Sequence, residues 1–446
     1  MSAVLQDQHT TTKDWLNDLF QVYEDGLNGH RDHPLAQFRR QAFRELQELD
    51  FPTRRDEDWK YTSVAPMLKQ PYQEGRPVAI NAKDLEGVVY PELNALQLVF
   101  TNGVLDPRHS DLDELPEGLH ILPVSQAMEA DDTRRWIEAQ VEQEGGTGKN
   151  TFLPLNRAFA GQGLLLRAER HAAIERPVHL IYLSAPGADP HFAHPQLFVQ
   201  AKTGSRLTLI ESYRALEPDS SYFTNAAAWI EVAANARVDH YRLQRESRAA
   251  YQINNILVRQ DRDSTYSSYV ADLGGKLVRN NLSTTLLNSN TQTNYYGIYL
   301  ANGKQHIDNQ TFIDHAVPHC QSNELYKGIL TDGARGVFNG KVMVRQDAQK
   351  TNAFQQNSSL VLSPRAVMDT KPQLEIYADD VRCSHGATIG QLDEAAVFYL
   401  RSRGIPGRQA RNLLQQAFLR EVVHFMALEP VAARVRALIE EKLREA

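Results

Sequence analysis

The sequence predicts a mainly β protein with a parallel β-helix core and helical segments at both ends, on three observations. Between residues 160 and 385, short apolar or alternating runs are separated by Gly, Pro, Asn and Asp, and no helical stripe interrupts them. Apolar pairs recur there roughly every 14 to 18 residues. Apolar stripes at spacings of three and four appear only before and after this region.

Residues 1–150 are expected to form an N-terminal helical and mixed domain. The segments "DWLNDLFQVYEDGL" and "HPLAQFRRQAFRELQELDFP" are predicted helices. The second carries one apolar stripe and ends at Pro52. Its members are Leu35, Phe38, Ala42, Leu46 and Leu49. After these, "ALQLVFTNGVLD" reads as a strand that turns at Asn102-Gly103, and "AMEADDTRRWIEAQVEQEGG" reads as a helix.

Residues 151–389 are expected to form the β core. The pairs Val342-Val344, Leu360-Leu362 and Leu374-Ile376 show the recurrence, with Asn, Gln, Asp and Ser between them. Very short strands with polar corners are typical of a parallel β-helix, in which each coil buries its inward side chains by stacking on the next. A β-sandwich is the alternative, although more than 200 residues of strand is long for one sandwich.

Residues 390–446 are expected to form a C-terminal helical domain. The helix "LDEAAVFYLRSRGIP" ends at Gly404, just before Pro406. Two amphipathic helices follow, and the first has a stripe of Leu414, Phe418, Val422 and Phe425. These stripes either pack inside the chain or present a groove to a partner.

Composition narrows the classes of function. The chain has 446 residues, 42% of them hydrophobic and 23% charged, with a net charge of −7. Neither a nucleic acid nor an anionic membrane is favoured as a partner. The N-terminus lacks a secretory signal and no apolar run is long enough to span a membrane, so a cytoplasmic location is expected. Two cysteines, Cys320 and Cys383, are too few for a disulfide framework or a four-cysteine cluster site.

Familiar catalytic motifs are absent from the sequence. The loop "GGTGKN", residues 145–150, lacks the earlier glycine and the final Ser or Thr of a phosphate-binding loop, so it is interpreted as a linker and the chain is not expected to hydrolyse ATP by itself. No serine-hydrolase elbow and no H-E-x-x-H pair occur. A β-helix enzyme acting on polysaccharides stays as a remote alternative without an identified acid/base pair.

Two clusters contain metal-ligand residue types. The segment "KQHIDNQTFIDHAVPHC" is interpreted as polar ladder and corner residues, because its spacing matches no ligand signature. Its members are His306, Asp308, Asp314, His315, His319 and Cys320. In "DVRCSHGATIG", Cys383 and His385 would share one face of a strand and could converge on one ion. A closed site needs further ligands, so the alternatives are a site shared with another chain or a buried thiol beside a hydrogen-bonded histidine.

The same segment carries a family resemblance. The run "DTKPQLEIYADDVRCSHGATIGQLDEAAVFYLRSRGI", residues 369–405, resembles the C-terminal signature of the SufB/SufD family, scaffold proteins of the SUF iron–sulfur cluster assembly system. The run "RRDEDWKYTSV", residues 54–64, resembles the N-terminal motif of its SufD branch. The order of helical N-terminus, β core and helical C-terminus matches the family over essentially the whole chain.

The resemblance implies a non-catalytic scaffold subunit with a right-handed parallel β-helix that pairs with SufB. It implies that the C-terminal helices dock the ATPase SufC, with Leu414, Phe418, Val422 and Phe425 as the docking candidates and ATP bound only by that partner. A transient iron–sulfur cluster would form at the subunit interface, with His385 as a ligand and Cys383 as either a second ligand or a supporting thiol. The chain alone is compatible with a homodimer, and participation of a reduced flavin cannot be inferred. The alternatives are a SufB-like paralogue and an interaction scaffold that never contacts metal.

Overall fold

The computed structural model describes residues 12–25, 33–143, 150–187 and 190–445. Its helices are α1 (Thr12–Asp25), α2 (Pro34–Glu48), α3 (Ala65–Leu68), α4 (Ala82–Leu85), α5 (Val124–Ala127), α6 (Asp131–Glu142), α7 (Phe152–Ala158), α8 (Glu394–Ser402), α9 (Gly407–Val423) and α10 (Glu429–Glu445). The early strands are β1 (Gln73–Glu74), β2 (Leu96–Thr101), β3 (Val104–Leu105), β4 (Leu119–Pro123), β5 (Leu164–Ala168), β6 (Val178–Ser184), β7 (His191–Ala193) and β8 (Gln196–Ala201). The later strands are β9 (Arg206–Ala215), β10 (Tyr222–Val232), β11 (Arg237–Arg245), β12 (Tyr251–Gln260), β13 (Thr265–Asp272), β14 (Leu277–Leu286), β15 (Gln292–Ala301), β16 (His306–His315), β17 (Gln321–Leu330), β18 (Arg335–Val344), β19 (Asn352–Val361), β20 (Val367–Ile376) and β21 (Arg382–Gly390).

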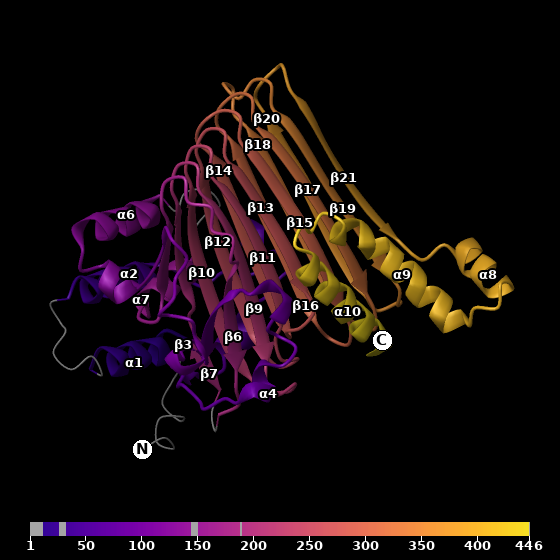
Figure 1. Cartoon of the computed structure of the whole chain (residues 1–446). Helices are drawn as coiled ribbons and strands as arrows, with labels where there is room; N and C mark the ends of the chain where they lie inside the picture. Colours follow the sequence, from indigo (N-terminus) through magenta and orange to yellow (C-terminus); the bar gives the residue numbers. More distant parts are fainter. Residues whose placement is uncertain (1–11, 26–32, 144–149, 188–189, 446) are drawn as a thin grey trace.

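These strands wind into a β-helix of about 8 turns, which confirms the predicted fold class (Figure 1). From β9 onward, successive strands alternate between two parallel sheets, so each coil contributes one strand to each sheet. The first sheet, sheet A, runs from β4 to β20, and the second, sheet B, runs from β3 to β21. The apolar pairs recur once per half-coil, because Val342, Leu360 and Leu374 lie on the successive strands β18, β19 and β20.

The corners of the coils explain the polar residues between the strands. Each of five turns leading from sheet A to sheet B contains one residue in the left-handed region. These residues are Asn235, Asp263, Asn290, His319 and Lys350. Asn and Asp adopt positive φ at lower cost than other non-glycine residues. Residues in this left-handed conformation therefore mark the corners of the coils, and His319 occupies one such position.

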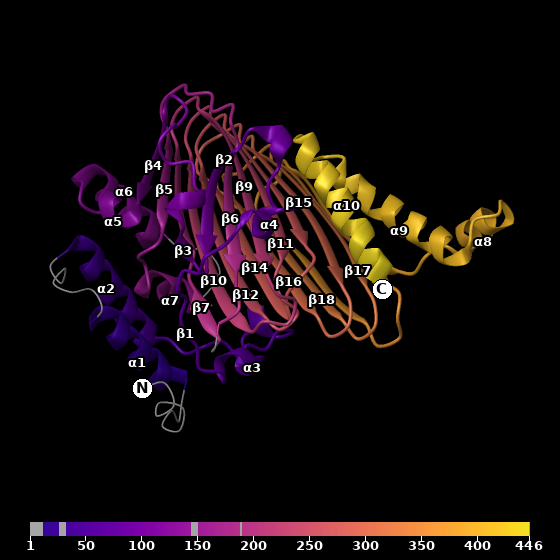
Figure 2. The same cartoon turned by 60° about the horizontal axis from the view of Figure 1, so that its bottom comes forward.

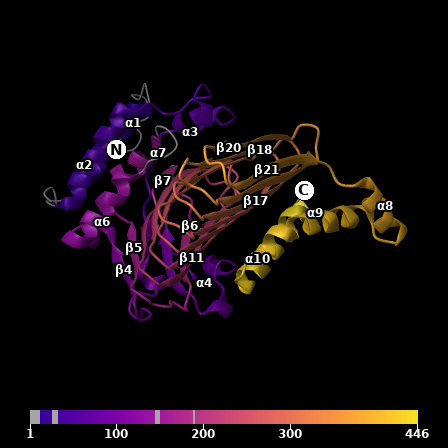
Figure 3. The same cartoon turned by 90° about the horizontal axis from the view of Figure 1, so that it is seen from above.

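The interior between the two sheets is apolar at the level of the first coils, with Leu180, Val199 and Leu209 fully buried. Helices cover the solenoid from outside. α9 and α10 lie on the outer face of sheet B (Figure 3). Val422, Val435 and Ile439 of these helices belong to one apolar cluster with Tyr241 and Ile298 of the sheet. Helices α1, α2, α6 and α7 lie near the first coils, away from α8 (Figure 2).

The N-terminal motif "RRDEDWKYTSV" fastens the first segment to the outer face of sheet A. Trp59 is buried beneath the guanidinium of Arg279, whose Cζ lies 3.7 Å from the ring centroid. Arg279 also donates to Asp308 Oδ2 at 2.7 Å, and Thr62 Oγ1 donates to the same carboxylate. Because Arg279 and Asp308 are both almost fully buried, each charge depends on the other for compensation.

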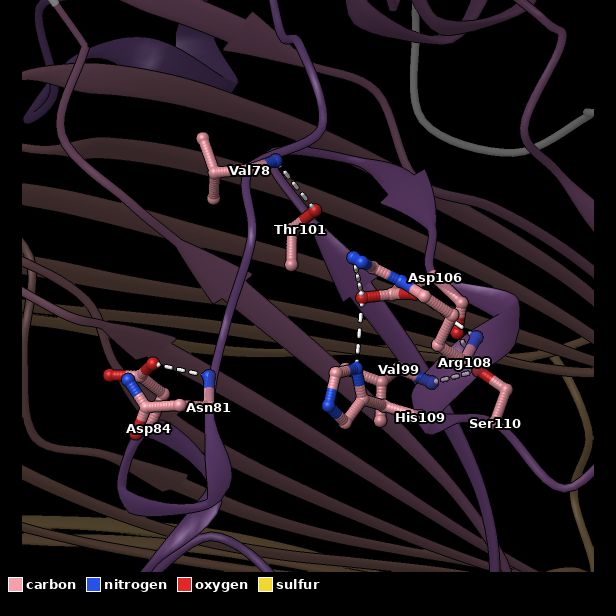
Figure 4. Close-up of polar contacts among 9 residues, drawn as sticks. All are labelled: Val78, Asn81, Asp84, Val99, Thr101, Asp106, Arg108, His109 and Ser110. Carbon is pink, nitrogen blue, oxygen red and sulfur yellow. Dashed lines mark hydrogen bonds and ion pairs between the residues drawn. The ribbon is translucent and has the colours of Figure 1, made fainter.

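The turn predicted at Asn102-Gly103 is confirmed, since both residues have positive φ between β2 and β3. Asp106 follows it and organises the next turn (Figure 4). Its carboxylate accepts from Arg108 Nε at 3.1 Å and contacts His109 Nδ1 at 3.0 Å. The Arg108 guanidinium, followed by His109, lowers the pKa of Asp106 to about 2. This turn fixes β3, the outermost strand of sheet B at the first end.

Among the described residues, no helix is both long and apolar enough to cross a membrane.

Candidate functional site

The last coil leaves two strand edges uncovered. Strand β20 is the terminal strand of sheet A and β21 is the terminal strand of sheet B. Most residues of β21 are exposed, including Ile389 at 52%. The edge of β20 is interrupted by Pro372, which has no backbone N–H to donate. The edge of β21 contains no proline, so it is the more complete template for pairing with another chain.

The register of β21 places Cys383 and His385 on its inward face. They pair with Ala353 and Gln355 of β19, whose side chains are buried inside the solenoid. Residues two apart on a strand point the same way, with bases about 6 to 7 Å apart. Both side chains therefore lie on the inward face of the last strand, at the mouth of the solenoid. The same-face prediction is confirmed by this register.

The two side chains differ in their surroundings. Cys383 is half-buried and packs against a small apolar group that includes Val342, Ala353 and Ala378. Burial raises the pKa of its thiol, so the protonated form is favoured at neutral pH. His385 is exposed. An exposed imidazole is free to bind a metal ion, whereas a thiol must first lose its proton.

The second cluster of metal-ligand residue types is dispersed by the fold. His306 contacts Thr62 on the outside of sheet A, and Asp314 accepts from Arg345 at 2.6 Å. His315 points inward, with Nε2 2.9 Å from Ser322 Oγ. Cys320 is fully buried. These residues therefore serve separate structural contacts in different places. The described part of the chain contains no group of three or more His, Cys, Asp or Glu residues arranged to hold a metal ion.

The C-terminal stripe lies partly inside the chain. Val422 is fully buried, and Leu414 and Phe418 are half-buried. Lys327 Nζ lies 4.5 Å from the Phe418 ring, and Phe425 stacks on Tyr296 with ring centroids 4.4 Å apart. Larger apolar exposure occurs on α8, where Phe398 is 71% and Tyr399 is 57% exposed. Sequence periodicity missed these two residues because they lie off the predicted stripe.

A groove of about 1040 Å³ connects the open end to these helices. Ile389 and Leu362 line it from the solenoid, and Arg408 and Arg411 line it from α9. The helix α8 projects beyond the last coil on the same side (Figure 1). The open mouth, the groove and α8 therefore form one accessible region. The loop at residues 145–150, interpreted as a linker, lies outside the described residues except for Asn150.

Comparison with known proteins identifies the family. Residues 183–418 match the model described as "SUF system FeS cluster assembly, SufBD core domain", and residues 10–180 match the "SufBD protein N-terminal region". The chain belongs to the SufBD family. Its place in this family shows a role in iron–sulfur cluster assembly.

Several members of the SufBD family are similar over most of their length. An iron–sulfur cluster assembly SufBD family protein of Synechocystis sp. is 33% identical, covering 98% of this chain and 97% of the relative. The iron–sulfur cluster assembly protein SufD of Escherichia coli is 31% identical, covering 93% and 94%. SufD of Bacillus subtilis is 28% identical, covering 65% and 66%.

Proposed function

We propose that this chain is a scaffold subunit that pairs through its open end with SufB, docks the ATPase SufC through its C-terminal helices, and supplies His385 to a transient iron–sulfur cluster at the interface with SufB. The observation that carries the proposal is the uncovered edge of β21 with His385 on the inward face at the mouth. A cytoplasmic location belongs to the same proposal.

The edge geometry supports pairing between scaffolds. A solenoid coil satisfies its backbone and buries its inward side chains only when another layer stacks on it. Here the last layer exposes Ile389, and Tyr377 is exposed just after β20. A second β-helix stacked end to end would cover both and continue the two sheets. SufB, as the paralogue expected to share this core, fits that requirement better than an unrelated surface.

Shared ligands suit a cluster that must be released. One exposed histidine and one half-buried thiol cannot enclose a cluster, and a closed site would hold its metal tightly. When the remaining ligands belong to SufB, separating the subunits opens the site. The cluster is therefore cargo rather than a resident cofactor.

The exposed apolar surface of the C-terminal helices supports docking of SufC. Phe398 and Tyr399 are exposed on α8, Leu413 is exposed on α9, and Phe425 is exposed just after α9. Val422 would act indirectly, because its buried side chain packs α9 against sheet B. Nucleotide-driven closure of a SufC dimer would then move α8 and α9, and with them the open end. In this arrangement ATP is bound by SufC and not by this chain.

The testing experiment is anaerobic co-expression with SufB and SufC, followed by iron and sulfide analysis of the purified complex. We expect His385→Ala to leave the melting temperature and complex formation unchanged while iron and sulfide fall at least about 10-fold. Ser384→Ala, which faces the other way on the same strand, is the matched control. Cys383→Ala should have a smaller effect, since its thiol is half-buried.

A complex of His385→Ala and Cys383→Ala combined that still carries wild-type iron and sulfide would support a pure interaction scaffold instead. Loss of the complex itself in His385→Ala would assign that histidine a structural role.

A further inference from the structure

A column of polar residues runs along the interior of sheet B and ends at His385. The register pairs His240 with Ser268, Ser268 with Tyr295, Tyr295 with Glu324, Glu324 with Gln355, and Gln355 with His385. The first five members of the column are buried. Aliphatic side chains fill such positions without the cost of burying polar groups. The two residues nearest the mouth, Glu324 and Gln355, are therefore unusual occupants of the core.

Glu324 is a buried carboxyl group without a cation beside it. It is 4% exposed and has no ion-pair partner among the described residues. Burial raises its pKa to about 7. It accepts a hydrogen bond from Gln355 Nε2 at 2.6 Å. A buried ionisable group of this kind costs stability unless its role requires it.

The amide of Gln355 is held in one orientation. Its nitrogen is fixed by Glu324, so its oxygen must point elsewhere, and Gln355 Oε1 is a buried acceptor without a hydrogen-bond partner in the described structure. Gly340 on β18 leaves the space for this amide, because a Cβ there would lie 2.3 Å from Gln355 Nε2. The unused acceptor therefore belongs to a fixed group one rung below His385.

We propose that Gln355, oriented by Glu324, is a positioning residue for His385 and accepts one ring N–H of that histidine through Oε1. This inference rests on the proposed role of His385 as a cluster ligand. A neutral imidazole that donates from one nitrogen presents the lone pair of the other. Gln355 thereby fixes the tautomer and the ring direction, so that the second nitrogen faces the mouth. Histidines that bind metals commonly need such a partner for the remaining N–H.

Tautomer measurement on the full chain tests this assignment. With ¹⁵N-labelled histidine, and with the His385 signals identified by comparison with His385→Ala, we expect one dominant tautomer in the wild type. Gln355→Leu removes the acceptor and should give a mixture of both tautomers. Gln356→Leu, on the outward face of the same strand, should behave like the wild type. An unchanged tautomer ratio in Gln355→Leu would overturn the assignment.

Two further variants separate positioning from simple destabilisation. Glu324→Gln keeps an acceptor for Gln355 Nε2 and should preserve the tautomer. The double variant Glu324→Met with Gln355→Leu removes both members of this hydrogen-bonded pair, so neither is left buried without the other and folding should survive. It should show the mixed tautomer. If the double variant folds and retains the single tautomer, Gln355 does not position His385.

Iron and sulfide content of the co-expressed complex distinguishes the two proposals. We expect Gln355→Leu to lower the content about 10-fold, and Glu324→Gln to restore most of it relative to Glu324→Met. If His385→Ala retains wild-type iron, His385 is not a cluster ligand. The tautomer measurement still decides whether Gln355 accepts a hydrogen bond from His385. If His385→Ala loses iron and Gln355→Leu does not, the cluster role stands and the positioning role fails.

Discussion

The two ends of the solenoid differ in how their terminal strands expose unpaired backbone groups. At the first end the terminal strands are β3, with two residues, and β4, with five, and both pair antiparallel to their neighbours. At the last end they are β20, with ten residues, and β21, with nine, both parallel to their neighbours. Short strands and reversed directions blunt an edge, whereas long regular strands leave it ready to pair.

The two ends also differ in how far other parts of the chain cover them. The first end is also surrounded by helices and by the turn around Asp106, and the apolar side chains of β3 and β4 are buried or partly buried there. The last end exposes Ile389 and His385. A repeat protein generally needs a cap at each end of its stack, and this requirement is the reason for proposing that SufB pairs with the last end.

The largest effect is expected from placing a charge at the open end. Ile389→Lys would bury an unpaired ammonium group in the proposed scaffold interface, at a cost of about 3 kcal/mol, or roughly 100-fold in affinity for SufB. Binding measured by calorimetry, with the melting temperature of the free chain as the folding control, checks this. His120→Lys, at the one exposed position of β4 at the first end, is the matched variant and should bind normally. Equal losses in both variants would contradict the assignment of the ends.

A smaller effect is expected from the histidines of the first coils. Burial lowers the pKa of His179 to about 3, of His194 to about 3 and of His191 to about 4. The unfolded chain binds protons on these residues below pH 6.5 and the folded chain does not, so stability is complete above pH 6.5 and falls as the pH drops toward 3. At pH 5.5 each histidine should lower the free energy of unfolding by about 1.4 kcal/mol.

Urea unfolding at pH 7.5 and 5.5 measures this loss. His179→Gln should reduce the difference between the two pH values by about 1.4 kcal/mol. Hydrogen exchange at pH 5.5 should show opening first at β6 and β7. Opening first at β20 and β21 would mean that the first end is not the acid-sensitive one.

The smallest effect is expected at the turn that closes the first end. Asp106 is held by Arg108, whose side chain is 69% exposed, so solvent screening limits the stabilisation to about 1 kcal/mol. Asp106→Asn should lose that amount at neutral pH. The loss should vanish as the pH falls from about 4 toward 2, because the wild-type carboxylate is then protonated too. Thermal unfolding at pH 7 and pH 2.5 distinguishes this from a pH-independent packing defect.

Several features of the fold and site followed from local sequence rules. Alternating runs with Asn and Asp corners predicted a stacked β core, because both signals arise within one half-coil. The i, i+2 spacing of Cys383 and His385 predicted a shared face, and the amphipathic stripes predicted the terminal helices. The family resemblance of residues 369–405 then pointed to His385. All of these depend on neighbours in sequence, where strand and helix periodicity are fixed by backbone geometry.

Only the tertiary structure decided which residues meet across coils. Glu324, Gln355 and His385 are separated by about a coil each, and single-residue changes in corner length set their register, so no local pattern reveals the column. The structure also showed that Val422 is internal while Phe398 and Tyr399 are exposed. It further decided that β21 is the last strand of sheet B in the described part of the chain. The sequence thus determined the repeating unit, and the stacking of these units determined which strands form the uncovered edges of the two sheets.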